Sequence, residues 1–181
     1  MPVTLEDDEY DIVNTYALVG LAVHDTQNVE GILKGSLVLV FKDSQGQPLA
    51  DLTDPKTQKQ TLGTFISMLK KKMDLNPQFE EILTAYLDHR NLLIHRLSDN
   101  KIYRFNDALG RKNIRAFLNL FWNERDVVAK TLVGFMMLWA DPEKYADLSK
   151  VRVRHPEGSW LGDAERIFAP HATSLIRKKL S

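Results

Sequence analysis

The sequence predicts an all-α fold, a bundle of antiparallel helices with short C-terminal helices. Apolar residues recur at helical spacing over three long segments, about 10–41, 77–97 and 112–139, and over a shorter one at 61–72. No segment shows convincing strand alternation, and the links between the helices are rich in turn-forming residues. Long helices joined in this way pack as a bundle.

The first predicted helix runs from Tyr10 to about Phe41 and ends in a loop over 43–55. Its glycines lower helix propensity but permit close approach of another helix. The spacing of three and four residues assigns its inward positions to Tyr10, Val13, Tyr16, Ala17, Gly20, Val23, Gln27, Glu30, Leu33, Leu37 and Val40.

Start and stop signals bound the other helices. Thr61 can cap the second helix, which runs to Lys72. Asn76 followed by Pro77 is a strong start for the third, which Ser98-Asp99-Asn100 stops. The fourth is expected from about Lys112 to Trp139, before Asp141-Pro142, and the rest reads as short helices with an irregular link.

Length and composition predict one domain, with a core over 1–142 and a helical extension over 143–181 that packs on it. The chain has no cysteine, so disulfides and thiolate sites are excluded. No histidine has metal-ligand spacing, and we expect neither metal nor cofactor. The acidic first residues and the lack of an apolar run of about 20 residues predict a cytoplasmic protein without a membrane span.

The third helix carries an anomaly, because Arg90 and Asn91 follow Tyr86 on the apolar stripe that resumes at Leu93. Unpartnered burial of a guanidinium and an amide costs several kcal/mol. These groups must therefore be paired, exposed in a groove, or placed at the surface of a second chain. His95 lies about 40° around the helix from Asn91, so Asn91 can orient its imidazole.

Arg90 and His95 are separated by about 140° and roughly 7.5 Å along a regular helix, so one helix cannot aim both at one atom. Loosening of the helix near His95 would unite them, and so would a twofold dimer that brings two copies of the segment into one cleft.

The segment Arg90-Asn91-Leu92-Leu93-Ile94-His95 resembles the arginine-to-histidine motif of HEPN domains. The resemblance to these domains covers about residues 10–140 of the chain. The resemblance implies a helical bundle, often dimeric, and in active members a metal-independent endoribonuclease. His95 would then act as general acid or base at an RNA 2′-hydroxyl, Arg90 would hold the phosphate, and Asn91 would position either group. The formal net charge of zero provides no global attraction for RNA, so contact must be local.

The alternative is a non-catalytic interaction or regulatory module of the same fold, in which Arg90 pairs with a carboxylate such as Glu30. Gln27 and Glu30 have inward spacing and are expected to face Arg90 or Asn91 across the bundle. His89 and Arg96 flank the motif as secondary binding candidates. The expected partners are a second copy of the chain, RNA as substrate, or another protein.

Overall fold

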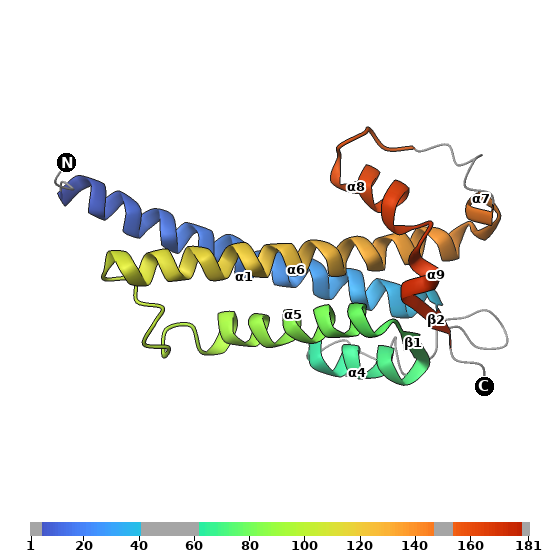
Figure 1. Ribbon diagram of the computed structural model, residues 1–181, viewed down its shortest axis with the longest axis horizontal. Helices are drawn as coiled ribbons and strands as arrows, with labels where there is room; N and C mark the ends of the chain where they lie inside the picture. Colours follow the sequence, from blue (N-terminus) through green and yellow to red (C-terminus); the bar gives the residue numbers. More distant parts are fainter. Residues whose placement is uncertain (1–4, 41–61, 147–153, 179–181) are drawn as a thin grey trace.

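Three long helices form the body of the molecule (Figure 1). The computed structural model describes residues 5–40, 62–146 and 154–178. The long helices are α1 (Leu5–Val40), α5 (Pro77–His95) and α6 (Ala108–Ala140), and the shorter α4 (Leu62–Lys72) lies beside them. The predicted all-α fold is confirmed. None of the described helices combines the length and the apolar character that crossing a membrane requires.

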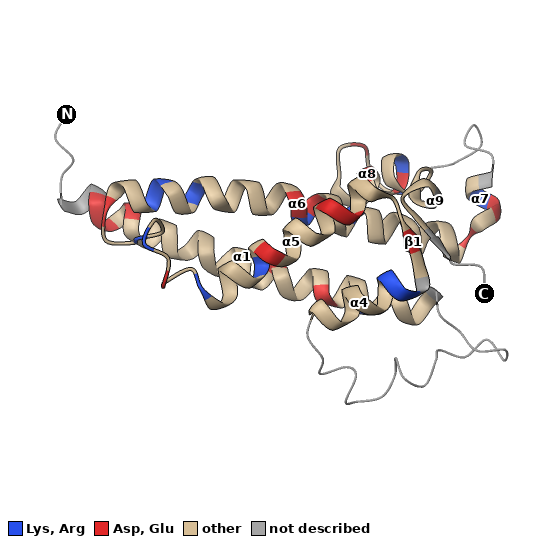
Figure 2. Cartoon of the chain, turned by 60° about the horizontal axis from the view of Figure 1, so that its bottom comes forward, with Lys and Arg blue, Asp and Glu red and all other residues tan. Residues whose placement is uncertain are grey.

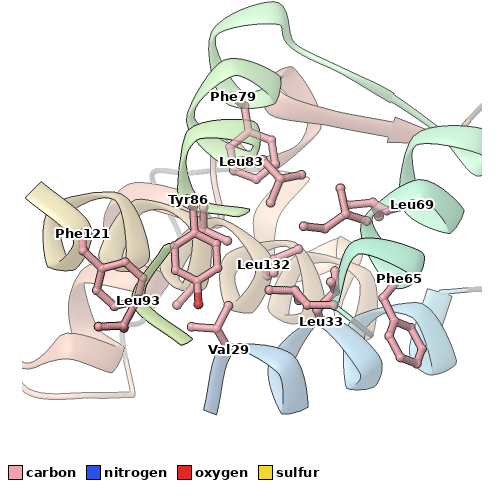
Figure 3. Close-up of a cluster of buried hydrophobic side chains, with 14 of the residues drawn as sticks. Val29, Leu33, Phe65, Leu69, Phe79, Leu83, Tyr86, Leu93, Phe121 and Leu132 are labelled. Carbon is pink, nitrogen blue, oxygen red and sulfur yellow. The ribbon is translucent and has the colours of Figure 1, made fainter. Parts of the chain in front are cut away.

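The core lies where α1, α4, α5 and α6 meet (Figure 3). Val29 and Leu33 of α1 face Leu83 and Tyr86 of α5, and Leu132 of α6 completes the cluster. Each of these side chains is at most 1% exposed. Burial of a side chain of this size contributes roughly 1.5–3 kcal/mol, so this cluster supplies much of the energy that holds the four helices together.

Local signals set the helix ends. Asn76 caps α5, because its Oδ1 accepts the backbone N–H of Gln78 at 2.9 Å, and Pro77 takes the first helical position. This predicted start is confirmed, whereas the end comes at His95, before the predicted stop. Helix α6 starts four residues before the predicted Lys112, because Asp107 accepts the backbone N–H of Gly110 at 2.7 Å. The cap predicted at Thr61 and the loop predicted over 43–55 lie outside the described residues.

The C-terminal residues pack on the second half of α6. They form α7 (Pro142–Ala146), α8 (Trp160–Asp163), a π-helical turn η2 (Ala164–Phe168) and α9 (Ala172–Leu175). Gly134 of α6 permits the contact with η2, because a Cβ there would come within 2.7 Å of the Ala169 nitrogen. A larger residue would push η2 away from α6.

Two short strands form a ribbon that the sequence analysis missed. Strand β1 (Met73–Leu75) pairs antiparallel with β2 (Ile176–Lys178). Each strand is three residues long, too short for alternation of apolar and polar residues to be recognised. The ribbon joins the C-terminal segment to the turn between α4 and α5 (Figure 1).

The first half of α1 exposes several side chains that were predicted to face inward. Tyr10, Val13 and Tyr16 were assigned inward, yet they are 75%, 60% and 56% exposed. Gly20 is exposed as well, with open space where a Cβ would stand. The buried positions are instead Thr15, Ala22, Thr26 and Val29. Because apolar residues occur all round this part of α1, their spacing does not identify the inner face.

Ion pairs fix the orientation of α1. Asp8 and Asp11 bind Arg111 of α6, whose side chain is only 2% exposed, and Asp11 also accepts from Arg115 at 2.7 Å. The distance from Arg111 Nε to Asp11 Oδ2 is 2.5 Å. Hydrogen bonds from Arg111 and then Arg115 lower the pKa of the Asp11 carboxyl.

We predict that Asp11→Asn lowers the melting temperature by about 4 °C at neutral pH. The lowered pKa means that the stabilisation by Asp11 is fully present above the ordinary aspartate range and is lost as the pH falls through the folded-state pKa. The melting temperatures of wild type and variant should therefore converge as the pH falls below the ordinary aspartate range of about 4. Glu9→Gln, at an exposed position of the same helix, is the control. A difference that does not shrink as the pH falls below that range would contradict the assignment.

Candidate functional site

Arg90 of α5 is held by two neighbours. Its Nη2 donates to Glu30 Oε1 of α1 at 2.7 Å, and its Nη1 donates to Asn91 Oδ1 at 3.2 Å. The side chains of Arg90 and Glu30 are 16% and 21% exposed, so the pair is largely but not fully buried. The pair joins α5 to α1 across the bundle. This is the Arg90–Glu30 pairing that was expected for the non-catalytic interaction module.

Further polar groups surround this pair inside the bundle. Asp25 of α1 accepts from Arg125 of α6 at 3.0 Å. Tyr86, one turn before Arg90, is fully buried, and burial together with the charge of Glu30 raises the pKa of its phenol. Among the described residues no hydrogen bond reaches Tyr86 Oη or the Nε atoms of Arg90 and Arg125. These atoms retain capacity for hydrogen bonds that the described side chains leave unused.

His95 and Arg96 lie at the end of α5 and are exposed. Helix α5 stays regular to His95, and the Arg96 N–H closes its last turn on Leu92 O at 2.9 Å. No hydrogen bond or ion pair between described residues links His95 to Arg90 or Asn91. One chain therefore does not assemble the three residues of the motif around a common point.

His89 has a different environment from His95. Its Nδ1 lies 2.7 Å from Glu124 Oε2 of α6, and its ring meets Phe117 edge-on at a centroid distance of 5.6 Å. The side chains of His89 and Glu124 are 28% and 13% exposed. The imidazole borders a shallow groove of about 660 Å³ whose rim includes Arg96 and Lys101. A carboxylate at Nδ1 orients the ring and leaves Nε2 directed to other partners.

Of the two residues of α1 predicted to face the motif, only Glu30 does so. Glu30 faces Arg90 as expected, but Gln27 is exposed on the outer side of α1, because the inner positions beside it are Thr26 and Val29. Sequence reasoning did not single out Glu124 or Arg125. A signal existed, since Glu124-Arg125-Asp126 interrupts the apolar spacing of α6.

The chemistry of this region is that of imidazoles, guanidinium groups and carboxylates. In the part of the chain that the structure describes, His, Asp and Glu side chains do not gather in threes as a metal site would need. Acidic and basic segments are interspersed along the helices in the view of Figure 2. Binding of an anion in this region therefore depends on a few local cations.

We predict that Arg90→Ala lowers the free energy of unfolding by about 3 kcal/mol, because Glu30 is left partly buried without its partner. Arg96→Ala, six residues further along at an exposed position, should change it by less than about 0.5 kcal/mol. Urea unfolding followed by circular dichroism measures both. Replacing the pair by Arg90→Met and Glu30→Leu together should recover most of the loss. Equal effects of the two alanine variants would show that the pair contributes no stability.

Comparisons with family models, with curated proteins and with solved structures found no match to this chain.

Proposed function

We propose that this chain is a HEPN-like, metal-independent endoribonuclease whose site is composed from two copies of the Arg90-Asn91-x-x-x-His95 segment. The observation that carries the proposal is the position of the motif at the end of α5, where His95 is exposed on the last helical residue. An exposed imidazole is accessible to substrate and to a second chain. An imidazole can act as a general acid or base without a metal ion.

Arg90 retains capacity to hold a phosphate. A guanidinium has five N–H donors, and the bonds to Glu30 and Asn91 use one donor each. The side chain remains 16% exposed, but its Nε is buried, so contact with a phosphate falls to the terminal Nη groups. When Arg90 binds a phosphate, Glu30 would orient the guanidinium, and the N–H donors that Glu30 does not use would contact the substrate.

A second copy would provide what one chain lacks, and α1 offers a surface for it. We define the outer stripe of α1 as seven exposed residues spaced three and four apart, namely Tyr10, Val13, Ala17, Gly20, His24, Gln27 and Gly31. No residue from 12 to 23 is charged. A helix that is apolar on both sides is expected to be covered on both sides, and spacing of this kind is typical of a helix–helix seam.

The outer stripe is complementary to itself in an antiparallel pair centred near Gly20. Tyr10 then lies opposite Gly31 of the second copy, where the structure leaves open space, and His24 lies opposite Ala17. Tyr10 and Val13 on the stripe, with Tyr16 and Leu21 that flank it, expose about 500 Å² in each copy, or at most about 1,000 Å² in a symmetric contact. That area is at the threshold of about 1,000 Å² that a specific interface is expected to exceed.

Such a pair would set the two motifs at similar levels on either side of the α1–α1 seam, with each α5 on the bundle side of its own α1. Helix α5 runs antiparallel to α1 (Figure 1), and Arg90 is level with Glu30 because the two are bonded. His95 lies roughly 7.5 Å further toward the N-terminal half of α1, level with residues near Asp25. The centre of the outer stripe is only about one turn beyond that level.

The second candidate is the non-catalytic interaction module of the same fold, and the Arg90–Glu30 ion pair favours it. A guanidinium committed to joining two helices need not act on a substrate, and buried ion pairs often serve packing specificity.

We predict that the purified protein cleaves single-stranded RNA in the presence of EDTA. His95→Ala should lower the rate by about 100-fold or more through loss of the acid or base, with an unchanged melting temperature. His171→Ala, at another exposed histidine, should retain the wild-type rate. Gel assays with end-labelled RNA measure the rates. No cleavage by wild type, or full activity of His95→Ala, would contradict the nuclease and favour the interaction module.

We predict also that the protein is a dimer at micromolar concentration and that Ala17→Asp makes it a monomer, because the new carboxylate is buried without a partner at the seam. Asn119→Asp introduces the same charge at an exposed position of α6 and should leave the dimer intact. Sedimentation velocity distinguishes the two states. RNA cleavage should fall together with dimerisation, and cleavage by a stable Ala17→Asp monomer would contradict the composite site.

A further inference from the structure

Beside the groove at His89 lies a second hollow of about 440 Å³, whose lining has more apolar side chains. His89 borders both hollows. The second lies between the connection from α5 to α6 and the first half of α6, and its lining includes Tyr103, Phe117 and Leu120. Leu120 is 49% exposed, and Tyr103 is half-buried against Phe117 at a centroid distance of 5.3 Å. We define the bipartite groove as these two hollows, which share His89 in their linings; the first is polar and the second apolar.

The polar end carries cations that are available to an anion. Arg96 and Lys101 are both exposed, and no ion pair to a described residue occupies either of them. Asp88 and Asp99 line the same end and are exposed, so the net charge there is small. Carboxylates accept hydrogen bonds from hydroxyl and amino groups. This end therefore fits a ligand that combines a phosphate with sugar or base donors, and not a bare polyanion.

His89 stands where the two ends meet. Glu124 binds its Nδ1 at 2.7 Å, so Nε2 is the ring atom that meets a ligand. When the ring is neutral and Nδ1 carries the proton, Nε2 accepts a hydrogen bond, and when the ring is protonated, Nε2 donates one to a phosphate oxygen. The order of these regions matches a nucleotide: the cationic end suits the phosphate, the position of the imidazole corresponds to the sugar, and the apolar end suits the base.

We propose that the bipartite groove binds a phosphorylated nucleoside, either free or as one residue of a single-stranded RNA. The phosphate lies against Arg96, Lys101 and His89 Nε2, and the base lies on the apolar end beside Tyr103 and Leu120. The volumes of both hollows are within the range of small-molecule sites. The RNA form of this ligand rests on the proposed function, but binding in the groove requires neither a second copy nor cleavage.

The test is isothermal titration of the full chain with adenosine 5′-monophosphate, with inorganic phosphate and with adenosine. The monophosphate should bind at least about tenfold more tightly than either fragment, because it occupies both ends. Lys101→Glu, a change at an exposed position that the fold tolerates, should weaken it about tenfold. His89→Ala should weaken it about as much, and His171→Ala should leave the affinity unchanged. Equal affinity for monophosphate and phosphate, or no effect of Lys101→Glu, would overturn the proposal.

A second arm separates the two sources of the ligand. If RNA is the natural ligand, an eight-residue oligoadenylate binds more tightly than the monophosphate, with a slope of log affinity against log salt near −1.4 for two phosphate contacts. If a free nucleotide is the ligand, the oligomer binds no more tightly than the monophosphate. The experiments distinguish failure of the nucleotide-binding proposal from failure of the nuclease proposal. Cleavage that depends on His95 but not on Lys101 contradicts only the groove, and nucleotide binding without cleavage contradicts only the nuclease.

Discussion

The structure depends on a set of ion pairs in which α1 provides the acids and the other helices provide the arginines. Asp8 and Asp11 bind Arg111 near one end of α1, Asp25 binds Arg125 in the middle, and Glu30 binds Arg90 further along. Because α1 is apolar on more than one side, burial of apolar area alone would allow several rotations of this helix. Only one rotation matches every carboxylate with a guanidinium, since rotation would leave buried charges unpaired at a cost of several kcal/mol.

The same arrangement explains why the arginine of the motif can have two roles. Arg90 is one member of this series and resembles Arg125, which also bridges to α1 and whose Nε also makes no hydrogen bond to a described residue. Arg90 differs from Arg125 in two ways: the residue that follows it and takes one of its donors is the uncharged Asn91 and not an aspartate, and His95 lies at the exposed end of the same helix. A role in stability and a role in substrate binding are compatible at a group with five donors.

Helix type and most helix positions could be predicted from sequence, because they depend on local patterns. Asn76 followed by Pro77 marks the start of α5, and the spacing of Phe117, Phe121 and Leu132 gives the inner face of α6. The inner face of α1 could not be predicted, since it is selected by partners far away in the chain. The pairing of Glu30 with Arg90 was foreseen as an alternative, whereas Glu124 was missed because its role appears only when α5 and α6 are side by side.

The β1–β2 ribbon has a consequence for the order in which the chain matures. Met73 pairs with Lys178, and the Asn76 N–H donates to Leu175 O at 2.8 Å, so the entrance to α5 is completed by residues near the end of the sequence. On the ribosome the three long helices are synthesised before this segment, and contacts between distant parts of a chain form slowly. Until residues 176–178 leave the exit tunnel, the strand edge at β1 stays open, and an open strand edge is a site for chaperone binding and aggregation.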